Sequence, residues 1–492
     1  MKKNRFLPPA LSLLALTFST CTSSQEQKEN PLPNIIYIYA DDMGVGDVGC
    51  YGQQYIKTPN IDRMAEEGIR FTQHYTGAPI CAPARCCLLT GKHSGNAYVR
   101  MNYEIPDSSA FRTGQLPIPD ETVTIAEVLK RSGYTTGVIG KWGLGSIESP
   151  GNPNKQGFDF FYGYADQVHA HNHFPTFLWR NGEQEFLRND VPSVHPKYEN
   201  DEEIDAREEY KKYMGPDYSL DLMTEEAKKF IDKNRETPFF LYIPYVIPHK
   251  ALQVPDESLE MYDGVFDEEP YDGKRGYTPH PKPLSAYAAI ITRTDRKIGE
   301  ILDHLKEAGL DENTLVMFSS DNGPAGGGGL DPRFFNSSAG LRGGKGQVYE
   351  GGIREPFVAR WPGKIPAGVT TGHVSAQYDL MATLAELAGQ EVTDTDGISF
   401  LPALLGKEKE QKQHEYLYWE FPRGHQVAVR IGDWKGVKAQ NRWSPDDKWQ
   451  VYNLAEDEAE ITDVADEHPE LIEKFEEIVK KRTPSHIEEW NF

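Results

Sequence analysis

Residues 34–42 of the chain read NIIYIYADD, an uninterrupted apolar run that ends in two carboxylates. A run of this length without polar alternation is typical of a strand that is buried on both faces of a sheet. Outward from it, strand-like and helix-like segments alternate as far as about residue 389. The alternation predicts an α/β fold with a large, mostly parallel sheet between two layers of helices.

The segments around this run have the lengths expected of a covered sheet. Strands are predicted at 34–40, 69–74, 135–139, 239–244 and 315–319. Helices are predicted at 59–67, 121–131, 218–234, 284–308 and 378–388. Beyond residue 390 the pattern changes to four short aromatic-rich strands and one amphipathic helix, at 415–421, 427–431, 434–438, 450–453 and 469–481. We therefore expect a main domain over 33–389 and a smaller α+β subdomain, an antiparallel sheet plus a helix, over 390–492.

Composition excludes several classes of protein. The chain has 492 residues, enough for a large core, and its 52 Lys and Arg against 75 Asp and Glu give a net charge of −23. So acidic a protein repels nucleic acid, and we expect no nucleic-acid partner. Five cysteines are too few for a disulfide-stabilised scaffold. No internal apolar run is long enough to cross a membrane.

The N-terminal residues have the pattern of a secretory leader. Basic residues at 2–5 precede an apolar stretch at 7–18, and Cys21 follows. This order predicts a signal peptide over 1–20, with Cys21 as the lipidated first residue of a lipoprotein and 21–32 as a tether. An ordinary signal peptide is the alternative. Either pattern predicts an exported protein, in the periplasm or on the outer membrane or cell surface, which touches a membrane only through a lipid anchor.

Four of the predicted strands run into charged or amide side chains: Asp41-Asp42, Gly140-Lys141, Pro248-His249 and Asp321-Asn322. Each pair alone fits an ordinary turn. However, the carboxyl ends of parallel strands form one edge of a sheet, and ligands bind there. The hard oxygens of Asp41, Asp42, Asp321 and Asn322 suit Ca²⁺ or Mg²⁺, and calcium tolerates irregular geometry better. Three carboxylates so close together repel one another unless a cation lies between them.

A cysteine stands in a position that attracts anions. Residues 81–85 read CAPAR, and Pro83 suits the first turn of a helix that begins at or next to Cys81. Helix N-termini attract anions through their free backbone N–H groups. Arg85 lies in the same first turns, so we expect Cys81 to lie beside a cation at an anion-binding place.

Cys81-x-Pro83-x-Arg85 followed by LLTG at 88–91 is the hallmark of a known family, and further motifs follow the family's order. They are PNIIYIYADDMGVGDVGCYG (33–52), GKWGLG (140–145), PH (248–249), SSDNGP (319–324) and GGKGQVYEGGIREP (343–356). Over about 33–480 the chain resembles the type I sulfatases of the alkaline phosphatase superfamily. The resemblance implies an alkaline-phosphatase-like fold and a sulfuric ester hydrolase.

The resemblance also implies a covalent mechanism at Cys81. In this family a maturation enzyme oxidises the motif cysteine to formylglycine, whose hydrate carries two hydroxyls on one carbon. One hydroxyl attacks sulfur and the alcohol leaves from a sulfated enzyme, after which the second hydroxyl expels sulfate. By position, one calcium ion is held by Asp41, Asp42, Asp321 and Asn322 together with the residue at Cys81.

Four further residues take roles by the same resemblance. Arg85 matches the residue that steadies the hydrated aldehyde, and His249 matches a histidine near the leaving oxygen. Lys141 and Lys345 match lysines that bind sulfate oxygens. These residue types suit the reaction, because it needs cations against the sulfuryl oxygens and an acid for the departing alkoxide.

One position departs from the family pattern. The commoner motif is Gly-Lys-Trp-His-Leu-Gly, and this chain has Gly143 in the place of the histidine. His169 and His171, in the segment HAHNH at 169–173, are candidates to bind the sulfate or the leaving oxygen instead. They share a side if the segment is extended. A surface loop and a zinc-binding cluster are the alternatives.

The motif variant also bears on the substrate. It resembles a subgroup that acts on sulfated galactose or N-acetylgalactosamine, which implies a sulfated mono- or oligosaccharide of host or algal glycans, with 6-O-sulfate expected rather than 4-O-sulfate. Trp179 and Arg180 are candidates to flank the sugar, and Arg100 is a candidate to reach the pocket. Ordinary packing and a surface charge are the alternatives for Trp179 and Arg180.

Two rival functions stand beside this one. A phosphate or phosphonate ester hydrolase of the same superfamily generally uses Thr or Ser and a histidine-rich zinc site, unlike Cys81 and its oxygen ligands. An inactive protein that binds sulfated glycans is favoured only by Gly143. Of the other cysteines, Cys86 and Cys87 are expected as buried thiols, and Cys50 as either buried or disulfide-bonded.

Overall fold

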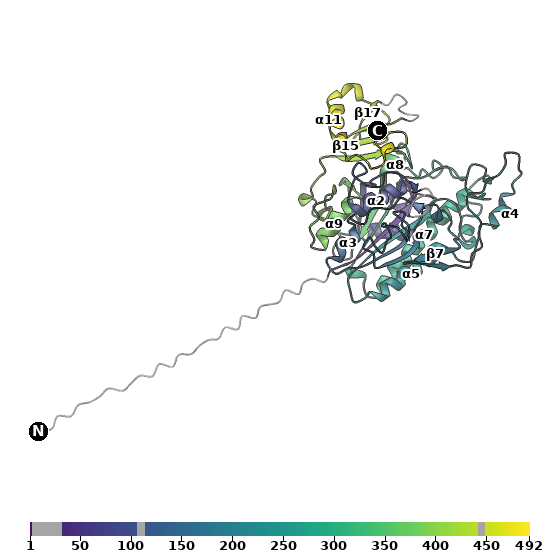
Figure 1. The fold of residues 1–492 in the computed structure, drawn as a ribbon, viewed down its shortest axis with the longest axis horizontal. Helices are drawn as coiled ribbons and strands as arrows, with labels where there is room; N and C mark the ends of the chain where they lie inside the picture. The colour runs from purple at the N-terminus through teal and green to yellow at the C-terminus, as the bar shows by residue number, and fades with distance from the viewer. Residues whose placement is uncertain (2–31, 106–113, 441–447) are drawn as a thin grey trace. The chain divides into compact units, whose positions relative to one another are not determined.

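The computed structural model of the chain describes residues 32–105, 114–440 and 448–492 (Figure 1). The predicted signal peptide, Cys21 and nearly all of the predicted tether lie outside these residues. Residues 32–492 form one compact unit. The division at residue 389 therefore concerns sheet architecture, and as a domain boundary it stays a proposal.

The large sheet has eleven strands, in the order β12-β2-β11-β10-β1-β9-β5-β6-β7-β8, with β13 paired to β2. Its central strands β10, β1, β9, β5 and β6 run parallel, while β11 is antiparallel to both β10 and β2. The strands are β1 (Asn34–Asp41), β2 (Ile69–Tyr75), β5 (Thr135–Lys141), β6 (Phe160–Tyr164), β7 (Phe177–Arg180), β8 (Glu183–Phe186), β9 (Phe239–Pro248), β10 (Thr314–Ser320), β11 (Arg354–Arg360), β12 (Val369–Thr371) and β13 (Ser375–Ala376). The predicted α/β fold with a mostly parallel sheet is confirmed.

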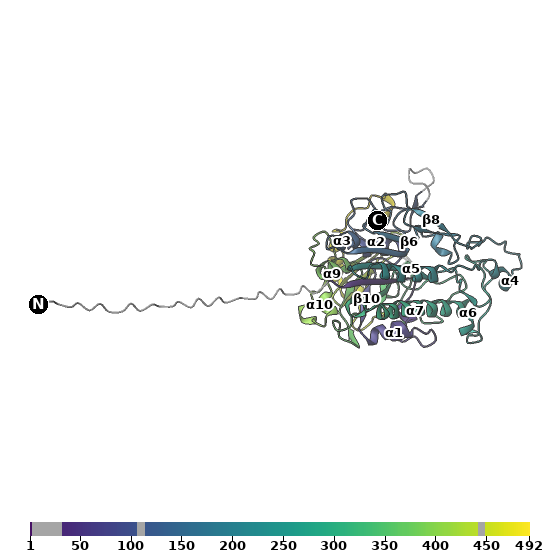
Figure 2. The same ribbon diagram turned by 90° about the horizontal axis from the view of Figure 1, so that it is seen from below.

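Both faces of the sheet are buried, as the unbroken apolar run of β1 predicts. Ile36 and Ile38 point into one core and Ile35 and Tyr37 into the other, because successive side chains of a strand alternate between faces. The first core is covered by α1 (Pro59–Glu66), α5 (Ser219–Lys233) and α7 (Pro283–Glu307). The second is covered by α2 (Cys81–Thr90), α3 (Ile125–Lys130) and α9 (Asp379–Leu387). Figure 2 shows α1 and α7 on the opposite side of the molecule from α2 and α3.

A separate antiparallel sheet follows the large one in the chain. Its strands pair in sequence order: β14 (Leu417–Phe421), β15 (Gln426–Ile431), β16 (Trp434–Lys438) and β17 (Trp449–Asn453). One face packs on α11 (Pro469–Val479) through residues such as Val429 and Phe475. The other face, with Trp419 and Val437, packs against residues of the main unit such as Tyr75 and Tyr349. Figure 1 shows this sheet and α11 in yellow and green at the C-terminal end of the colour scale.

The remaining elements are short. They are β3 (Glu104–Ile105), β4 (Gly114–Gln115), α4 (Ala206–Lys211), α6 (Asp256–Leu259), α8 (Glu350–Ile353) and α10 (Leu401–Leu404). Among the described residues, no helix is both long enough and apolar enough to cross a membrane.

One predicted helix is shorter than its sequence pattern suggests. The segment predicted at 121–131 is helical only over α3, because Thr124 caps it. The Thr124 hydroxyl accepts a hydrogen bond from the Glu127 N–H, and the Glu127 carboxylate accepts one from the Thr124 N–H. This reciprocal pair is a capping box, and it fixes the first helical residue.

Candidate active site

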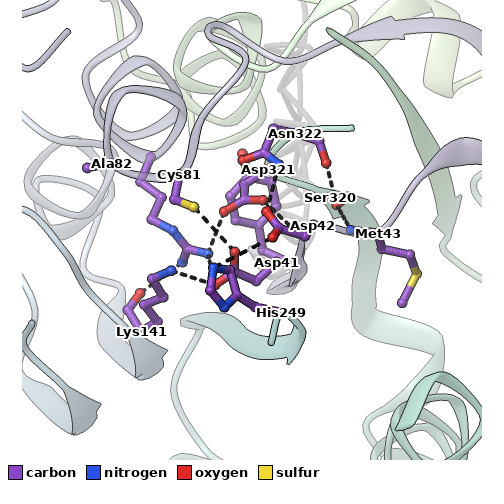
Figure 3. Close-up of polar contacts among 12 residues, drawn as sticks. Asp41, Asp42, Met43, Cys81, Ala82, Lys141, His249, Ser320, Asp321 and Asn322 are labelled. Atoms are coloured by element: carbon purple, nitrogen blue, oxygen red, sulfur yellow. Dashed lines mark hydrogen bonds and ion pairs between the residues drawn. The ribbon is translucent and has the colours of Figure 1, made fainter. Parts of the chain in front are cut away.

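The carboxyl ends of four parallel strands meet at one place, as their register requires. Ala40 of β1 stands opposite Ser320 of β10, and Asp41 stands opposite Pro248 of β9. Asp41, Asp42, His249, Asp321 and Asn322 therefore converge, with Lys141 from the end of β5 (Figure 3). The sequence-based expectation that these strand ends share one edge is met in the structure.

The acidic residues form a tightly linked centre. The Asp42 N–H donates to Asp321 Oδ1 at 3.0 Å, and Asn322 Nδ2 donates to Asp42 Oδ1 at 2.8 Å. Asp42 has a positive φ of 69°, a left-handed conformation that Asp adopts more readily than most residues. Ligand atoms of Asp41, Asp42, Cys81 and His249 all lie within 4.8 Å of one another.

Three cations from distant parts of the chain surround these acids. Arg85 Nη2 lies 2.8 Å from Asp321 Oδ2 and 3.6 Å from Asp41 Oδ2. Lys141 Nζ lies 2.6 Å from Asp41 Oδ2. Lys345 Nζ lies 2.6 Å from Asp42 Oδ1. The cations are thus held at the centre by the same carboxylates that are candidates to bind a metal.

The two carboxylates that flank Arg85 have pKa values shifted in opposite directions by their surroundings. Burial alone would raise the pKa of Asp41, but Lys141, His249 and Arg85 hold it well below the usual range. Burial and the neighbouring Asp41 charge raise the pKa of Asp321 to about 7, against the opposing effect of Arg85. The centre therefore carries one carboxyl whose charge the protein alone does not fully stabilise.

A divalent cation fits this centre. Asn322 Oδ1 is buried and has no hydrogen-bond partner among the described residues, although an amide oxygen buried in this way normally has one. Asp41, Asp42 and Asp321 add hard carboxylate oxygens around it, the donor type that Ca²⁺ and Mg²⁺ bind. A zinc site built on Cys81 is disfavoured, since burial and Asp41 raise the pKa of its thiol to about 12, whereas zinc binds the thiolate.

Cys81 is the first residue of α2, where the sequence places it. It is buried, and its Sγ lies 3.4 Å from Asp41 Oδ1 (Figure 3). Arg85 is one turn further along, and its Nη1 donates to the Lys141 carbonyl at 2.9 Å. The helix thus carries the sulfur and the guanidinium to the same point. Cys86 and Cys87 are buried thiols in this helix, and Cys50 is a partly exposed free thiol.

The structure separates the two histidine candidates. The ring of His171 stacks on that of His249, with centroids 4.4 Å apart and planes at 12°, and His171 Nδ1 lies 2.8 Å from His195 Nε2. His169 packs instead against Tyr164 and Phe177. Of the two, His171 is the one brought to the site.

The structure does not bring the other predicted substrate-binding residues, Arg100, Trp179 and Arg180, to the cavity. Arg100 is 2% exposed, and its guanidinium contacts Glu420 at 2.7 Å and the Thr483 carbonyl at 2.6 Å. Arg180 pairs with Glu185 and Glu226 on the outer part of the large sheet. Trp179 packs against the core. None of these three predicted residues lines the cavity described below.

Gln167 fills the space beside Gly143, and sequence reasoning missed it. Gly143 has a φ of +78°, and a Cβ on it would lie 1.8 Å from Gln167 Nε2. Gln167 is buried, and within the part of the chain that the structure describes its amide has no hydrogen-bond partner at either end. A glutamine 24 residues along the chain carries no signal of this contact, which the pairing of β5 with β6 creates.

A cavity of about 800 Å³ opens above the centre. Asp42, His249 and Lys345 lie in its lining, together with Lys250, Tyr277 and residues between 324 and 347. Lys250 and Tyr277 were also missed by sequence reasoning, because neither belongs to a recognisable motif. A volume of this size suits a small ligand of one or a few sugar units.

Comparison with known proteins agrees with this geometry. The family model described as Sulfatase matches residues 33–390, and the model described as N-sulphoglucosamine sulphohydrolase, C-terminal, matches 344–485. The chain is 30% identical to an N-acetylgalactosamine-6-O-sulfatase of Bacteroides thetaiotaomicron, in an alignment that covers 97% of this chain and 98% of that one. It is 35% identical to human arylsulfatase A, with 82% of this chain and 74% of that one covered.

Solved structures show the same architecture. The crystal structure of Ps i-CgsB superposes with a TM-score of 0.73 at 28% identity and covers 92% of this chain and 93% of its own. A structure from glycosaminoglycan metabolism in Bacteroides thetaiotaomicron superposes with a TM-score of 0.71 at 28% identity, over 92% and 99% of the two chains. On the family model, the relatives and the assembled centre together, this protein belongs to the sulfatase family and is an enzyme of that class.

Proposed function

We propose that the enzyme removes an O-sulfate group from a sulfated galactose or N-acetylgalactosamine unit, at O6 rather than O4. The observation that carries the proposal is the convergence of Cys81, four metal-ligand candidates and the cations Arg85, Lys141 and Lys345 below one cavity. The choice of sugar is supported by the relative named N-acetylgalactosamine-6-O-sulfatase, which matches nearly the full length of this chain. Ps i-CgsB, which was crystallised with k-i-k-neocarrahexaose, supports a saccharide substrate.

The proposed site also needs a modified residue at position 81 and a bound metal ion. We propose that Cys81 is converted to formylglycine by a maturation enzyme and that its hydrate supplies the nucleophile. Asp41, Asp42, Asp321 and Asn322, with the residue at position 81, would hold one divalent ion, which we take to be Ca²⁺. The ion supplies positive charge for the nucleophile and the sulfate.

The side chains of this protein supply the remaining steps. Lys141 and Lys345 lie where they neutralise sulfuryl oxygens as charge develops on them. Arg85, whose guanidinium is fully buried between Asp41 and Asp321, fixes the residue at 81 against the acids.

His249 is the proposed acid for the leaving oxygen. Its Nδ1 donates to the Lys250 carbonyl and His171 stacks on its face, so the ring is held with Nε2 toward Asp42, 3.6 Å from Oδ2. Burial and Lys345 hold the pKa of His249 well below its usual value in the ligand-free protein. A bound sulfate offsets the Lys345 charge and raises that pKa, so that Nε2 gains the proton it delivers to the alkoxide.

The two rival functions are less well supported. A phosphate or phosphonate hydrolase would share the fold but is not the class to which the matching family model and the curated relatives belong. An inactive binder has only Gly143 in its favour, and Gln167 occupies the space of the missing side chain there.

Cellular location is likewise a proposal. The leader pattern at 1–20 and Cys21 support export as a lipoprotein of the periplasm or cell surface, with the lipid as its sole attachment to a membrane.

The function is tested at Cys81 itself. The protein is produced together with a formylglycine-generating enzyme, and the peptide containing Cys81 is analysed by mass spectrometry. The same protein is assayed on galactose and N-acetylgalactosamine that carry a 6-O- or a 4-O-sulfate. The matching phosphate esters are assayed in parallel. We expect an aldehyde at Cys81 and release of sulfate, fastest from a 6-O-sulfate. Cys81→Ala abolishes turnover, while the matched control Cys86→Ala, in the same helix, retains it.

Three results would contradict the proposal. A thiol at Cys81 together with no desulfation removes the sulfatase chemistry. Faster hydrolysis of the phosphate esters favours the rival hydrolase. Faster release from the 4-O-sulfates corrects the position of attack and leaves the enzyme class unchanged.

A further inference from the structure

The cavity above the active centre contains a buried lysine that forms no ion pair with a carboxylate of the described residues. Lys250 lies directly after His249, just beyond the end of β9, and is 7% exposed. Its Nζ donates to the Gly326 carbonyl and lies 5.7 Å from the centre of the Tyr277 ring. No carboxylate within 32–105, 114–440 or 448–492 forms an ion pair with it.

The lack of an ion pair among the described residues is unusual for a lysine buried to this extent. An ammonium group that leaves water loses hydration, which one carbonyl and the face of a ring replace only in part. The two neighbouring lysines of the centre are satisfied, since Lys141 pairs with Asp41 and Lys345 pairs with Asp42, each at 2.6 Å. The structure therefore leaves the charge of Lys250 available to a ligand.

The position of Lys250 is fixed by its surroundings. The glycine-rich segment 326–329 lies against its side chain, and a Cβ on Gly328 would come within 2.8 Å of Lys250 Cδ. The Tyr277 ring lies 6.1 Å from that of His249 and 5.7 Å from that of His171. Tyr277 thus lies near both Lys250 Nζ and the pair of stacked histidines.

The charged residues that line the cavity also favour an anionic ligand. Of the described residues that line it, Lys250, Arg333, Arg342 and Lys345 are cationic, and Asp42 and Asp331 are acidic. Both acids are already paired, Asp42 with Lys345 and Asp331 with Arg333. In a protein with a net charge of −23, an excess of cations in one cavity attracts an anionic ligand to that place.

We propose that Lys250 and Tyr277 form a binding position for a second anionic group of the substrate, a carboxylate or a second sulfate on the sulfated sugar or on its neighbour. Lys250 Nζ donates to the anionic oxygens, and the Tyr277 ring packs against the sugar between the two charges. The inference rests on the proposed glycan sulfatase function and adds a specificity to it, because it selects doubly anionic sugars over singly sulfated ones.

The test uses substrates that differ in the second charge. Formylglycine-bearing enzyme is assayed on N-acetylgalactosamine 6-O-sulfate, on its 4,6-di-O-sulfate, and on a disaccharide that joins the 6-O-sulfate to a uronic acid. The variants are Lys250→Met, which removes the charge, Lys250→Arg, which keeps it, and Lys364→Met, a control at an exposed turn outside the cavity lining.

We expect wild type to prefer at least one doubly anionic substrate, measured as the ratio of its kcat/KM to that of the singly sulfated sugar. Lys250→Met should reduce this ratio about tenfold, the scale of one charge-assisted hydrogen bond. Lys250→Arg and Lys364→Met should keep most of it. The substrate that wild type prefers identifies the second group as sulfate or as carboxylate.

Several outcomes would overturn the proposal. A wild-type enzyme without the preference refutes it, as does a preference that Lys250→Met leaves intact. An equal loss on all three substrates also refutes it, because Lys250 would then act on the shared sulfate or on the fold.

If Lys250→Met does not fold, the salt dependence of the wild-type enzyme tests the proposal. Its KM for the preferred substrate should rise more steeply with sodium chloride than its KM for the singly sulfated sugar, and equal slopes refute the proposal. A wild-type enzyme that hydrolyses none of the three contradicts the proposed function instead.

Discussion

Asp41 and Asp321 share one arginine, yet their pKa values move in opposite directions. Arg85 Nη2 lies between them, at 3.6 Å from Asp41 and 2.8 Å from Asp321. Asp41 also has Lys141 at 2.6 Å, whereas no lysine forms an ion pair with Asp321 within the described part of the chain. The difference leaves Asp321 as the carboxyl that most needs a bound cation.

This difference predicts how the cation-free protein responds to pH. The pKa of Asp321 is about 7 in the fold, above the value of about 3.9 for an unfolded aspartate. The folded state then binds more protons between these values, so the free energy of unfolding in EDTA should fall as pH rises from about 4 to about 7. Urea unfolding over this range should show that slope reduced in Asp321→Asn.

Two comparisons make the pH prediction decisive. Asp201→Asn, at an exposed position, should leave the slope as in wild type. Calcium should raise the unfolding free energy of wild type most at neutral pH, because Asp321 must lose its proton to bind the ion. A calcium effect that is independent of pH would argue against Asp321 as a ligand.

The side chain of Gln167 leaves no room for a side chain at position 143. Restoring the commoner residue as Gly143→His forces a Cβ into Gln167 Nε2 at 1.8 Å, with φ at +78°. Overpacking of this kind costs about 1–3 kcal/mol of the free energy of unfolding, and the left-handed backbone adds about 1–2 kcal/mol. Urea denaturation should show the loss.

A variant at a second glycine distinguishes the cost of overpacking from the cost of the left-handed backbone. Gly133 has a φ of +85° with nothing within 4 Å of its Cβ position, so Gly133→Ala should show the backbone cost alone. Gly143→His combined with Gln167→Gly should regain part of the stability. No recovery in that double variant would mean that Gln167 is not the obstacle.

At the scale of elements, caps and register decide where each functional residue lies. Cys81 begins α2 and Arg85 follows one turn later, so one helix delivers both to Asp41 and Asp321. The parallel pairing of β1 with β9 and β10 aligns three strand ends within one residue of each other. Neither arrangement depends on the loops that line the cavity.

The cap of α3 gives a prediction at this scale. Thr124→Ala removes the hydroxyl that accepts the Glu127 N–H, and loss of such a cap costs about 1 kcal/mol of the free energy of unfolding. Thr122→Ala, in the same segment outside the helix, is the matched control and should change stability little. Equal unfolding midpoints for the two variants would show that the cap does not limit stability.

At the scale of the whole molecule, the small sheet is joined to the large unit by buried charge as well as by apolar contacts. Lys435 of β16 lies 2.9 Å from Glu350 and 2.9 Å from Glu460, and all three are fully buried. Burial works against ionisation of Glu350, but Lys435, Arg354 and Arg430 hold its pKa at about 2. Lys435 therefore pairs with two glutamates at this contact, and Arg354 also pairs with Glu350, at 2.8 Å.

Removing Lys435 should destabilise the contact between the small sheet and the main unit. Lys435→Met removes a buried cation that pairs with both Glu350 and Glu460, and breaking a buried ion pair in this way costs about 3–5 kcal/mol. We expect a clearly lower Tm and faster proteolysis within 415–480. Lys438→Met, at the end of the same strand, is the control, and a Tm equal to that control would refute the role of Lys435.

Much of the fold follows from local pattern. The strand runs at 34–40, 239–244 and 315–319 appear as β1, β9 and β10, because a continuous apolar run has a stable place only inside a covered sheet. The other strands of the large sheet, β6, β7, β8, β11, β12 and β13, were not predicted. The pairing of β11 and β12 depends on partners far away in sequence, such as β2 for β11, and their own residues carry only weak signals.

The sequence alone determined the chemistry-bearing residues Asp41, Asp42, Cys81 and Arg85, since strand ends and a helix start are local features. The tertiary structure decided which further groups reach them. It brought His171 rather than His169 to His249, put Gln167 beside Gly143, and assigned Arg100 to Glu420. It also left Lys250 without an ion pair to any carboxylate of the described residues. Such contacts join residues that are far apart in the chain, and packing selects one among many possible pairings, so only the folded molecule fixes them.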